Sequence, residues 1–124
     1  MNRTVLYVED DRLNAAMMLN ALTRENGLAV LAATSGEQAL ELAQAQQPDL
    51  ILLDIGLPGI DGFEVLRRLR NDPRSSHIPV VALTGYDVND EFMKESGFAS
   101  YLSKPFVVQE LIRIVHVILE GKGG

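Results

Sequence analysis

The 124-residue chain contains no cysteine, which excludes a disulfide framework, a thiolate metal site and cysteine catalysis. It also lacks an apolar run close to the roughly 20 residues that a membrane-spanning helix requires. The N-terminal segment becomes acidic too early for a signal peptide, so we expect a cytoplasmic protein. No basic cluster offsets the net charge of −6, and such a surface repels a nucleic-acid backbone.

What the chain does contain is an alternation of short apolar runs and helix-forming segments, at a length that suits one domain. The pattern predicts strands at 4–9, 28–33, 50–53, 78–84 and 100–103. It predicts helices at 13–23, 35–46, 63–70, 91–96 and 107–120. Such an alternation is typical of an α/β fold, a single five-stranded parallel sheet with helices on both faces. The domain would span 1–124, with its core at about 4–120 and a flexible tail at 121–124.

Several residues predict where helices begin and end. Ser35 with Gln38, and Asp61 with Glu64, have the spacing of capping boxes. Gly27 stands in the position of a helix terminator.

The apolar residues of two helices predict which side packs on the sheet. In the first helix, much of one face is shared by Leu13, Ala16, Met17 and Met18. In the last helix, one face carries Val108, Leu111, Ile112, Val115 and Leu119. The last helix also has Ile114 and Val117, so its apolar arc is wider than burial of one face requires.

Charged and polar residues follow the strands, where parallel sheets bind ligands. Glu9, Asp10 and Asp11 follow the first strand and Asp54 ends the third. Each has an ordinary structural explanation, since Asp10 or Asp11 could cap a helix and Asp54 could begin the turn of "GLPG". Together, however, they bring like charges close to one another, which requires a raised pKa or a cation.

A positive charge and a hydroxyl follow the other two strands. Thr84 ends the fourth strand, and Lys104 follows the fifth. Taken alone, Thr84 could simply be a β-branched residue at the end of a strand, and Lys104 could be a solvated surface lysine. With oxygen ligands alone nearby, the fitting cation is Mg²⁺ or Mn²⁺. Lysine, hydroxyl and metal would form a clamp for a transferred phosphoryl group. One carboxylate would then be the nucleophile, since aspartyl phosphates are an established covalent intermediate. Asp54 is the best candidate, because it stands alone on the central strand and faces the acidic pair.

The motifs "VEDD", "LLDIGLPGIDG", "VVALTG" and "YLSKPF", in this order and spacing, resemble the receiver domain of two-component response regulators over essentially the whole chain. The resemblance implies a flavodoxin-like strand order 2-1-3-4-5. It implies Mg-dependent transfer of a phosphoryl group from a phosphohistidine, with a histidine kinase or a histidine phosphotransfer protein as the donor. A downstream protein partner is implied, or a phosphorylation-dependent dimer, without direct contact to nucleic acid or membrane. Such a domain is not an enzyme in the usual sense, because it catalyses only its own phosphorylation and dephosphorylation.

The resemblance also implies roles around the acidic site. Asp54 would be the phosphoacceptor. Asp10 would bind Mg²⁺ directly and Glu9 mainly through water, with Asp54 and the backbone carbonyl of Gly56 as further ligands.

Further roles concern the switch. Thr84 would hydrogen-bond the attached phosphoryl group and Lys104 would pair with it, and a cis Lys104–Pro105 peptide bond would direct the lysine toward the site. Tyr101 occupies the family's aromatic switch position, although a half-buried strand aromatic explains it equally well. Phosphorylation would change the surface formed by the fourth helix, the fifth strand and the last helix.

Two features depart from the family pattern and two other classes remain as alternatives. Relatives often carry a larger residue at Gly56, and the stretch from Thr84 to Lys104 is shorter by roughly two residues, more than half a helical turn. An aspartate-nucleophile small-molecule phosphatase would use similar chemistry, but it needs a second Asp at the position of Gly56. A flavin or nucleotide module would need a glycine-rich loop after the first strand, where this chain has acids.

Overall fold

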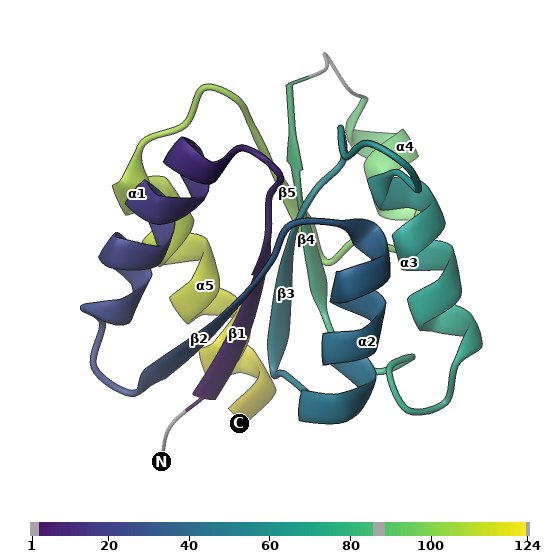
Figure 1. The fold of residues 1–124 in the computed structure, drawn as a ribbon, viewed down its shortest axis with the longest axis horizontal. Coiled ribbons are helices and arrows are strands. Elements are labelled where there is room, and N and C mark those ends of the chain that lie inside the picture. The colour runs from purple at the N-terminus through teal and green to yellow at the C-terminus, as the bar shows by residue number, and fades with distance from the viewer. Residues whose placement is uncertain (1–2, 86–88, 124) are drawn as a thin grey trace.

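The computed structural model describes residues 3–85 and 89–123, in which five strands alternate with five helices (Figure 1). The strands are β1 (Arg3–Val8), β2 (Leu28–Ala33), β3 (Leu50–Asp54), β4 (Val80–Thr84) and β5 (Ser100–Ser103). The helices are α1 (Arg12–Thr23), α2 (Gly36–Gln46), α3 (Gly62–Asn71), α4 (Asp90–Glu95) and α5 (Val108–Gly123). All strand pairs are parallel, and the sheet order β2-β1-β3-β4-β5 confirms the predicted fold.

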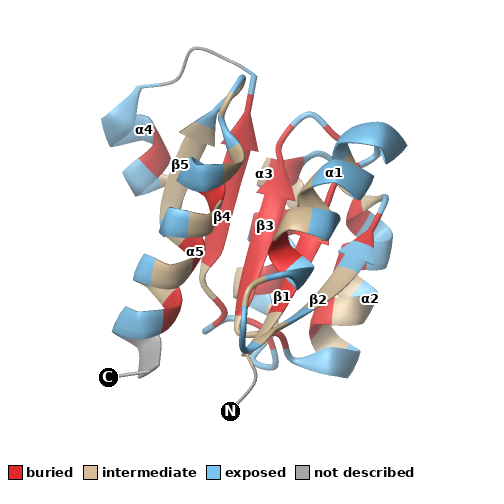
Figure 2. Cartoon of the chain, turned by 90° about the vertical axis from the view of Figure 1, so that its left-hand side faces the viewer, coloured by how far each residue is buried: buried red, intermediate tan, exposed pale blue. Residues whose placement is uncertain are grey.

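The sheet lies between two layers of helices, with α1 and α5 on one face and α2, α3 and α4 on the other (Figure 1). Alternate residues of each strand supply two apolar clusters, because successive side chains point to opposite faces. Leu6, Ile51 and Ala82 pack toward α2 and α3, while Val5 and Leu52 pack toward α1 and α5. The central strands are therefore buried throughout (Figure 2), which makes them a rigid base for whatever follows their carboxyl ends.

Of the four residues predicted to share an apolar face of α1, only Met18 packs against the core. Leu13 is 72% exposed and Met17 55% exposed, whereas Leu22 is buried and Met18 and Leu19 pack against the core. The inner stripe thus runs through positions 18, 19 and 22, which are spaced as one helical face. Two large apolar side chains are left on the surface close to the end of β1.

Other boundaries differ from prediction for local reasons. α1 ends at Thr23 and is capped by Arg24, so Gly27 (φ +82°) does not terminate it but turns the chain into β2. β4 begins at Val80, after Pro79, which has no N–H to donate to the sheet. α5 continues to Gly123, beyond the predicted end.

The predicted starts of α2 and α3 are confirmed, although each capping box differs from the standard hydrogen-bond pattern. The Ser35 hydroxyl accepts from the Gln38 N–H at 3.1 Å, but the Gln38 side chain accepts from the Thr34 N–H at 2.8 Å, one residue earlier than in a standard box. Asp61 accepts from the Glu64 N–H at 3.0 Å, while Glu64 turns outward to pair with arginines of its own helix. None of the helices in the described part of the chain has the length and apolar character needed to cross a bilayer.

Candidate functional site

The carboxyl ends of β1 and β3 bring three acidic side chains together. Val8 of β1 pairs with Leu53 of β3, so Glu9 and Asp54 follow at the same level of the sheet. One oxygen from each of Glu9, Asp10 and Asp54 lies within 4.8 Å of the others. Glu9 is 2% and Asp54 6% exposed, whereas Asp10 is exposed. The predicted convergence of carboxylates is therefore present.

Asp54 is held at both of its carboxylate oxygens. Oδ1 accepts a hydrogen bond from the Gly56 N–H at 3.0 Å, and Oδ2 accepts one from the Lys104 ammonium at 3.0 Å. The chain turns away directly after β3, and the Gly62 N–H at the start of α3 donates back to the Ile55 carbonyl at 3.0 Å. Because β3 is fully buried, the carboxylate stands at the end of a strand that is packed on both faces.

The two buried acids carry their charge unequally. Burial raises the pKa of Glu9 to about 8, and its hydrogen bond and charge repulsion with Asp54 act in the same direction. Burial alone would raise the pKa of Asp54, but hydrogen bonds from Glu9, Lys104 and the Gly56 N–H hold it below its usual range. The surroundings thus favour the neutral form of Glu9 and the ionised form of Asp54.

This donor set fits a hard divalent cation. Three carboxylates offer only oxygen ligands, which Mg²⁺ prefers, and the exposed Asp10 leaves an open side for water and a phosphate oxygen. A cation there would offset the burial and the repulsion that raise the pKa of Glu9. Glu9, Asp10 and Asp54 are thus the side chains that would hold it.

The cationic side of the site is formed by Lys104. Its ammonium lies 3.0 Å from Asp54 Oδ2 and 3.7 Å from Glu9 Oε1, and its side chain is 31% exposed. The Lys104 N–H donates to the Thr84 carbonyl at 2.7 Å, which links the ends of β4 and β5. Thr84 is buried at the end of β4, and the Lys104–Pro105 peptide bond is cis, the isomer expected from sequence.

Tyr101 lies on β5 in a half-buried position and packs against the α2–α3 side of the core. Its hydroxyl donates a hydrogen bond to Asp90, the first residue of α4. The sequence did not predict this contact. It couples the predicted switch residue to the short helix beside it, while the switching role itself stays a prediction.

The helix-capping alternative applies to one of the three acids after β1. Asp11 is the N-cap of α1 and accepts from the Leu13 and Asn14 N–H groups at 3.0 and 3.2 Å. Asp10 is thereby left available to the acidic site. The Gly56 backbone carbonyl as a metal ligand stays a prediction.

A cavity of about 450 Å³ adjoins the site and is lined by residues of α1 and of the loop that joins β5 to α5. Glu9 and Lys104 form the wall that it shares with the acidic site, and Tyr7 and Asn14 add polar groups. The sequence analysis did not identify Tyr7 or Asn14. The period of two along β1 could have pointed to Tyr7, because it lies on the same side of the strand as Glu9.

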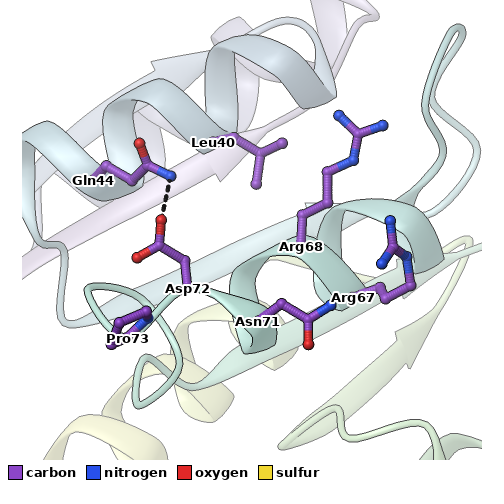
Figure 3. A pocket seen from close by; sticks show the side chains of 7 residues that line it. All are labelled: Leu40, Gln44, Arg67, Arg68, Asn71, Asp72 and Pro73. Carbon is purple, nitrogen blue, oxygen red and sulfur yellow. Dashed lines mark hydrogen bonds between the residues drawn. The ribbon is translucent and has the colours of Figure 1, made fainter.

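A second cavity, about 440 Å³, lies in the groove between α2 and α3, away from the strand ends (Figure 3). Its two arginines, Arg67 and Arg68, are both paired with Glu64. Across the groove, Gln44 donates to Asp72 at 2.8 Å and so joins the two helices. These polar groups satisfy one another, so the groove holds the helices together and is not the candidate site.

Comparison with known proteins agrees with this geometry. The family model for the response regulator receiver domain matches residues 5–116. The polar-differentiation response regulator DivK of Brucella ovis is 37% identical over 93% of this chain and 94% of its own length. The receiver domain of Francisella response regulator 1452 is 31% identical, with a TM-score of 0.87 over 98% of this chain and 99% of that one. The receiver domain of a sensor histidine kinase from Pseudomonas aeruginosa PAO1 is also 31% identical, with a TM-score of 0.83 over 97% and 99%, and its structure has a magnesium ion coordinated in the active-site cleft.

Proposed function

Because this chain belongs to the response regulator receiver domain family, we propose that Asp54 is the residue that accepts its phosphoryl group. The chain is a phosphoacceptor domain of two-component signalling. The observation that supports the assignment is the pair of contacts on Asp54, with Lys104 on one oxygen and the Gly56 N–H on the other. Asp54 is also the acid that stays ionised when Glu9 holds the proton.

The residues around Asp54 suit attack on phosphorus. The low pKa of Asp54 keeps its carboxylate free of a proton, and an ionised oxygen is the nucleophile that the reaction needs. Lys104 lies where a phosphoryl oxygen bound to Asp54 would develop charge. Thr84, at the adjacent strand end, would hydrogen-bond that group.

Glu9, Asp10 and Asp54 would hold the Mg²⁺ on which the transfer depends, and Mn²⁺ meets the same ligand requirement. When bound, the metal supplies positive charge to the phosphoryl oxygens. Binding it requires Glu9 to give up its proton, since the ionised carboxylate is the form that binds a cation. The chain would catalyse only its own phosphorylation and dephosphorylation, which predicts no turnover of a generic phosphomonoester.

Incubation with Mg²⁺ and acetyl phosphate is expected to add one phosphoryl group, and the substitution Asp54→Asn is expected to abolish the addition. Intact-mass spectrometry measures both results. Asp61→Asn is the matched control, because Asp61 caps α3 and asparagine caps helices about as well as aspartate. Undiminished labelling of Asp54→Asn would contradict the assignment.

The phosphodonor is proposed to be a histidine kinase or a histidine phosphotransfer protein. Such a donor must bring its phosphohistidine to Asp54, so it must cover the rim of the site. Three exposed apolar residues each stand next in sequence to a residue that lines the adjoining cavity: Leu13 and Met17 on α1, and Val107 after β5. Their exposure provides apolar area for a transient protein contact.

The output surface is proposed to include α4, β5 and α5. Val117 on α5 is 56% exposed and Ile114 is half-buried, so the wide apolar arc seen in the sequence does reach the surface. If Thr84 moved toward an attached phosphoryl group and Tyr101 followed it, the hydrogen bond from Tyr101 to Asp90 would break and the α4–β5 edge would change shape.

A beryllofluoride mimic is expected to change self-association or the affinity for a partner, and Val117→Glu is expected to abolish that change. Sedimentation and partner titrations with and without the mimic measure it. Ala45→Glu introduces the same charge at an exposed position of α2, on the opposite layer, and serves as the control. An equal response in wild type and Val117→Glu would remove α5 from the output surface.

A further inference from the structure

A row of three aromatic rings runs from the core to the surface between α3 and α4. Phe98 is buried, and its ring meets that of Phe63 on α3 edge-on, with the centroids 5.8 Å apart. Phe63 meets Phe92 on α4 in the same way, with the centroids 5.7 Å apart. Phe92 is 52% exposed, so the outer end of the row leaves a large apolar surface in water. Aromatic residues are enriched in the cores of protein interfaces.

The two helices that border this row carry opposite charges. α3 has three arginines and one glutamate, which gives it a net charge of +2. α4 has three acids and one lysine, which gives it a net charge of −2. The two helices lie next to each other in the same layer (Figure 1). A surface with a positive half, a negative half and an apolar residue between them is complementary to a second copy of itself.

The outward-facing charges of α4 are Glu91 and Glu95, which are exposed and lie about one helical turn apart on one face. Asp90 faces β5 instead, where it accepts the hydrogen bond from the Tyr101 hydroxyl. Among the residues that the structure describes, neither Glu91 nor Glu95 belongs to an ion pair. Both carboxylates are therefore available to a partner beside Phe92.

The matching positive charge on α3 is Arg67, which lies about one turn after Phe63 and so on the same side of the helix. Its side chain is 61% exposed. Arg67 shares Glu64 with Arg68, since one carboxylate oxygen of Glu64 contacts both guanidinium groups, and a net positive charge remains. Surface ion pairs contribute little to stability, so a second carboxylate can approach Arg67 without the loss of a strong interaction.

We propose that this surface binds a second copy of the chain, in a two-fold dimer whose axis runs between α3 and α4. In this arrangement α4 of each copy lies on α3 of the other, and Phe92 of one copy meets Phe63 of the other. Glu95 follows Phe92 by three residues and Arg67 follows Phe63 by four. Both charges therefore lie about one turn further along their helices and face each other across the dimer, and every contact occurs twice.

This dimer differs from the proposed output surface, because it uses α3 in place of β5 and α5. It also does not depend on phosphorylation. Burial of Phe92 supplies the apolar contact, while the pairs of opposite charge fix the orientation of the two copies and exclude partners with the wrong charge pattern.

Sedimentation equilibrium of the unphosphorylated protein at low ionic strength measures the association, which added salt should weaken. Glu95→Arg and Arg67→Glu should each raise the dissociation constant by at least about tenfold, since each places like charges opposite one another at two points. Phe92→Ala should have a similar effect, because it removes the apolar centre of the interface. All three positions are exposed, so the substitutions leave the core intact.

Mixing the two charge variants tests the geometry. In a mixed dimer of Glu95→Arg and Arg67→Glu, opposite charges face each other again at both points, so the mixture should associate about as tightly as the wild type. Arg24→Glu is the matched control, because it makes the same change of charge as Arg67→Glu at an exposed position after α1, in the opposite layer. With labelled Glu95→Arg, it should bind more weakly than the wild type binds itself, by about threefold, because one of the two contacts stays repulsive.

A wild type that stays monomeric at about 1 mM would overturn the dimer. Wild-type affinity in Glu95→Arg or Arg67→Glu alone would do the same. Equal binding of Arg67→Glu and Arg24→Glu to Glu95→Arg would also overturn it, since that result would show attraction by net charge without the proposed contacts. None of these outcomes affects labelling of Asp54, so the phosphoacceptor function is tested separately.

Discussion

Raising the pH from 6 to 8 is expected to destabilise the metal-free protein by about 2 kcal/mol through Glu9 alone. The pKa of Glu9 is about 8 in the folded chain against a usual 4.5. Between these values the folded state holds a proton that the unfolded state has lost, so the free energy of unfolding falls as the pH rises. Asp54 acts in the opposite sense and only at low pH, since its pKa is lowered.

Chemical denaturation in the presence of a chelator measures this loss. Glu9→Gln is the matched variant, because glutamine keeps the size of the side chain and cannot ionise, and it should lose less stability over the same pH interval by about 2 kcal/mol. Every other ionisable group is common to the two proteins and therefore cancels in the comparison. An equal loss in the two proteins would show that Glu9 does not hold the proton.

Saturating Mg²⁺ should offset the loss of stability that Glu9 causes at high pH. A cation favours the ionised carboxylate, so the wild type should gain more stability from Mg²⁺ at pH 8 than at pH 6. Glu9→Gln should gain less than the wild type at pH 8, because it lacks one of the three carboxylates. The same side chain thus costs stability without the metal and provides it with the metal.

The buried strands and their carboxyl ends could be predicted because both depend on chain-local patterns. A continuous apolar run such as Leu50–Leu53 has few alternatives to a central parallel strand. When strands and helices alternate, the strands of the sheet are parallel, so the carboxyl ends of β1, β3, β4 and β5 lie at the same edge of the sheet. The positions of Glu9, Asp54 and Lys104 in one site follow from that topology.

The inner face of α1 could not be chosen from its sequence. The segment is apolar around much of its circumference, so position 17 and position 18 are equally acceptable by pattern. Packing against the sheet and α5 decides, and it buries Leu22 while leaving Met17 exposed. The residues left out of the core, Leu13 and Met17, are large apolar side chains on the surface.

Contacts between side chains that are far apart in the sequence also could not be predicted from it. The hydrogen bond from Tyr101 to Asp90 depends on how α4 sits beside β5, and the raised pKa of Glu9 depends on its depth and its separation from Asp54. Neither quantity is encoded in a local pattern. A motif names the residues of a site, while packing sets their charge states.

Gly62→Ala is expected to destabilise the protein by about 2–3 kcal/mol and to slow phosphorylation of Asp54. Gly62 is buried at the start of α3, and a Cβ atom there would lie 2.7 Å from the Ile55 Cα and 3.2 Å from the Asp54 carbonyl oxygen. Both neighbours are backbone atoms, so no side chain can rotate to relieve the overlap. The end of β3 and the start of α3 would have to separate, and Asp54 stands on that strand end.

Gly121→Ala separates this effect from the general effect of adding a methyl group. A Cβ atom at Gly121, in the exposed last turns of α5, meets nothing within 4 Å among the described residues, so alanine there should be neutral or stabilise by at most about 1 kcal/mol. Thermal unfolding and acetyl phosphate labelling of both variants make the comparison. If Gly62→Ala unfolds at the wild-type temperature and labels at the wild-type rate, the close approach of α3 to β3 does not hold the phosphoacceptor in place.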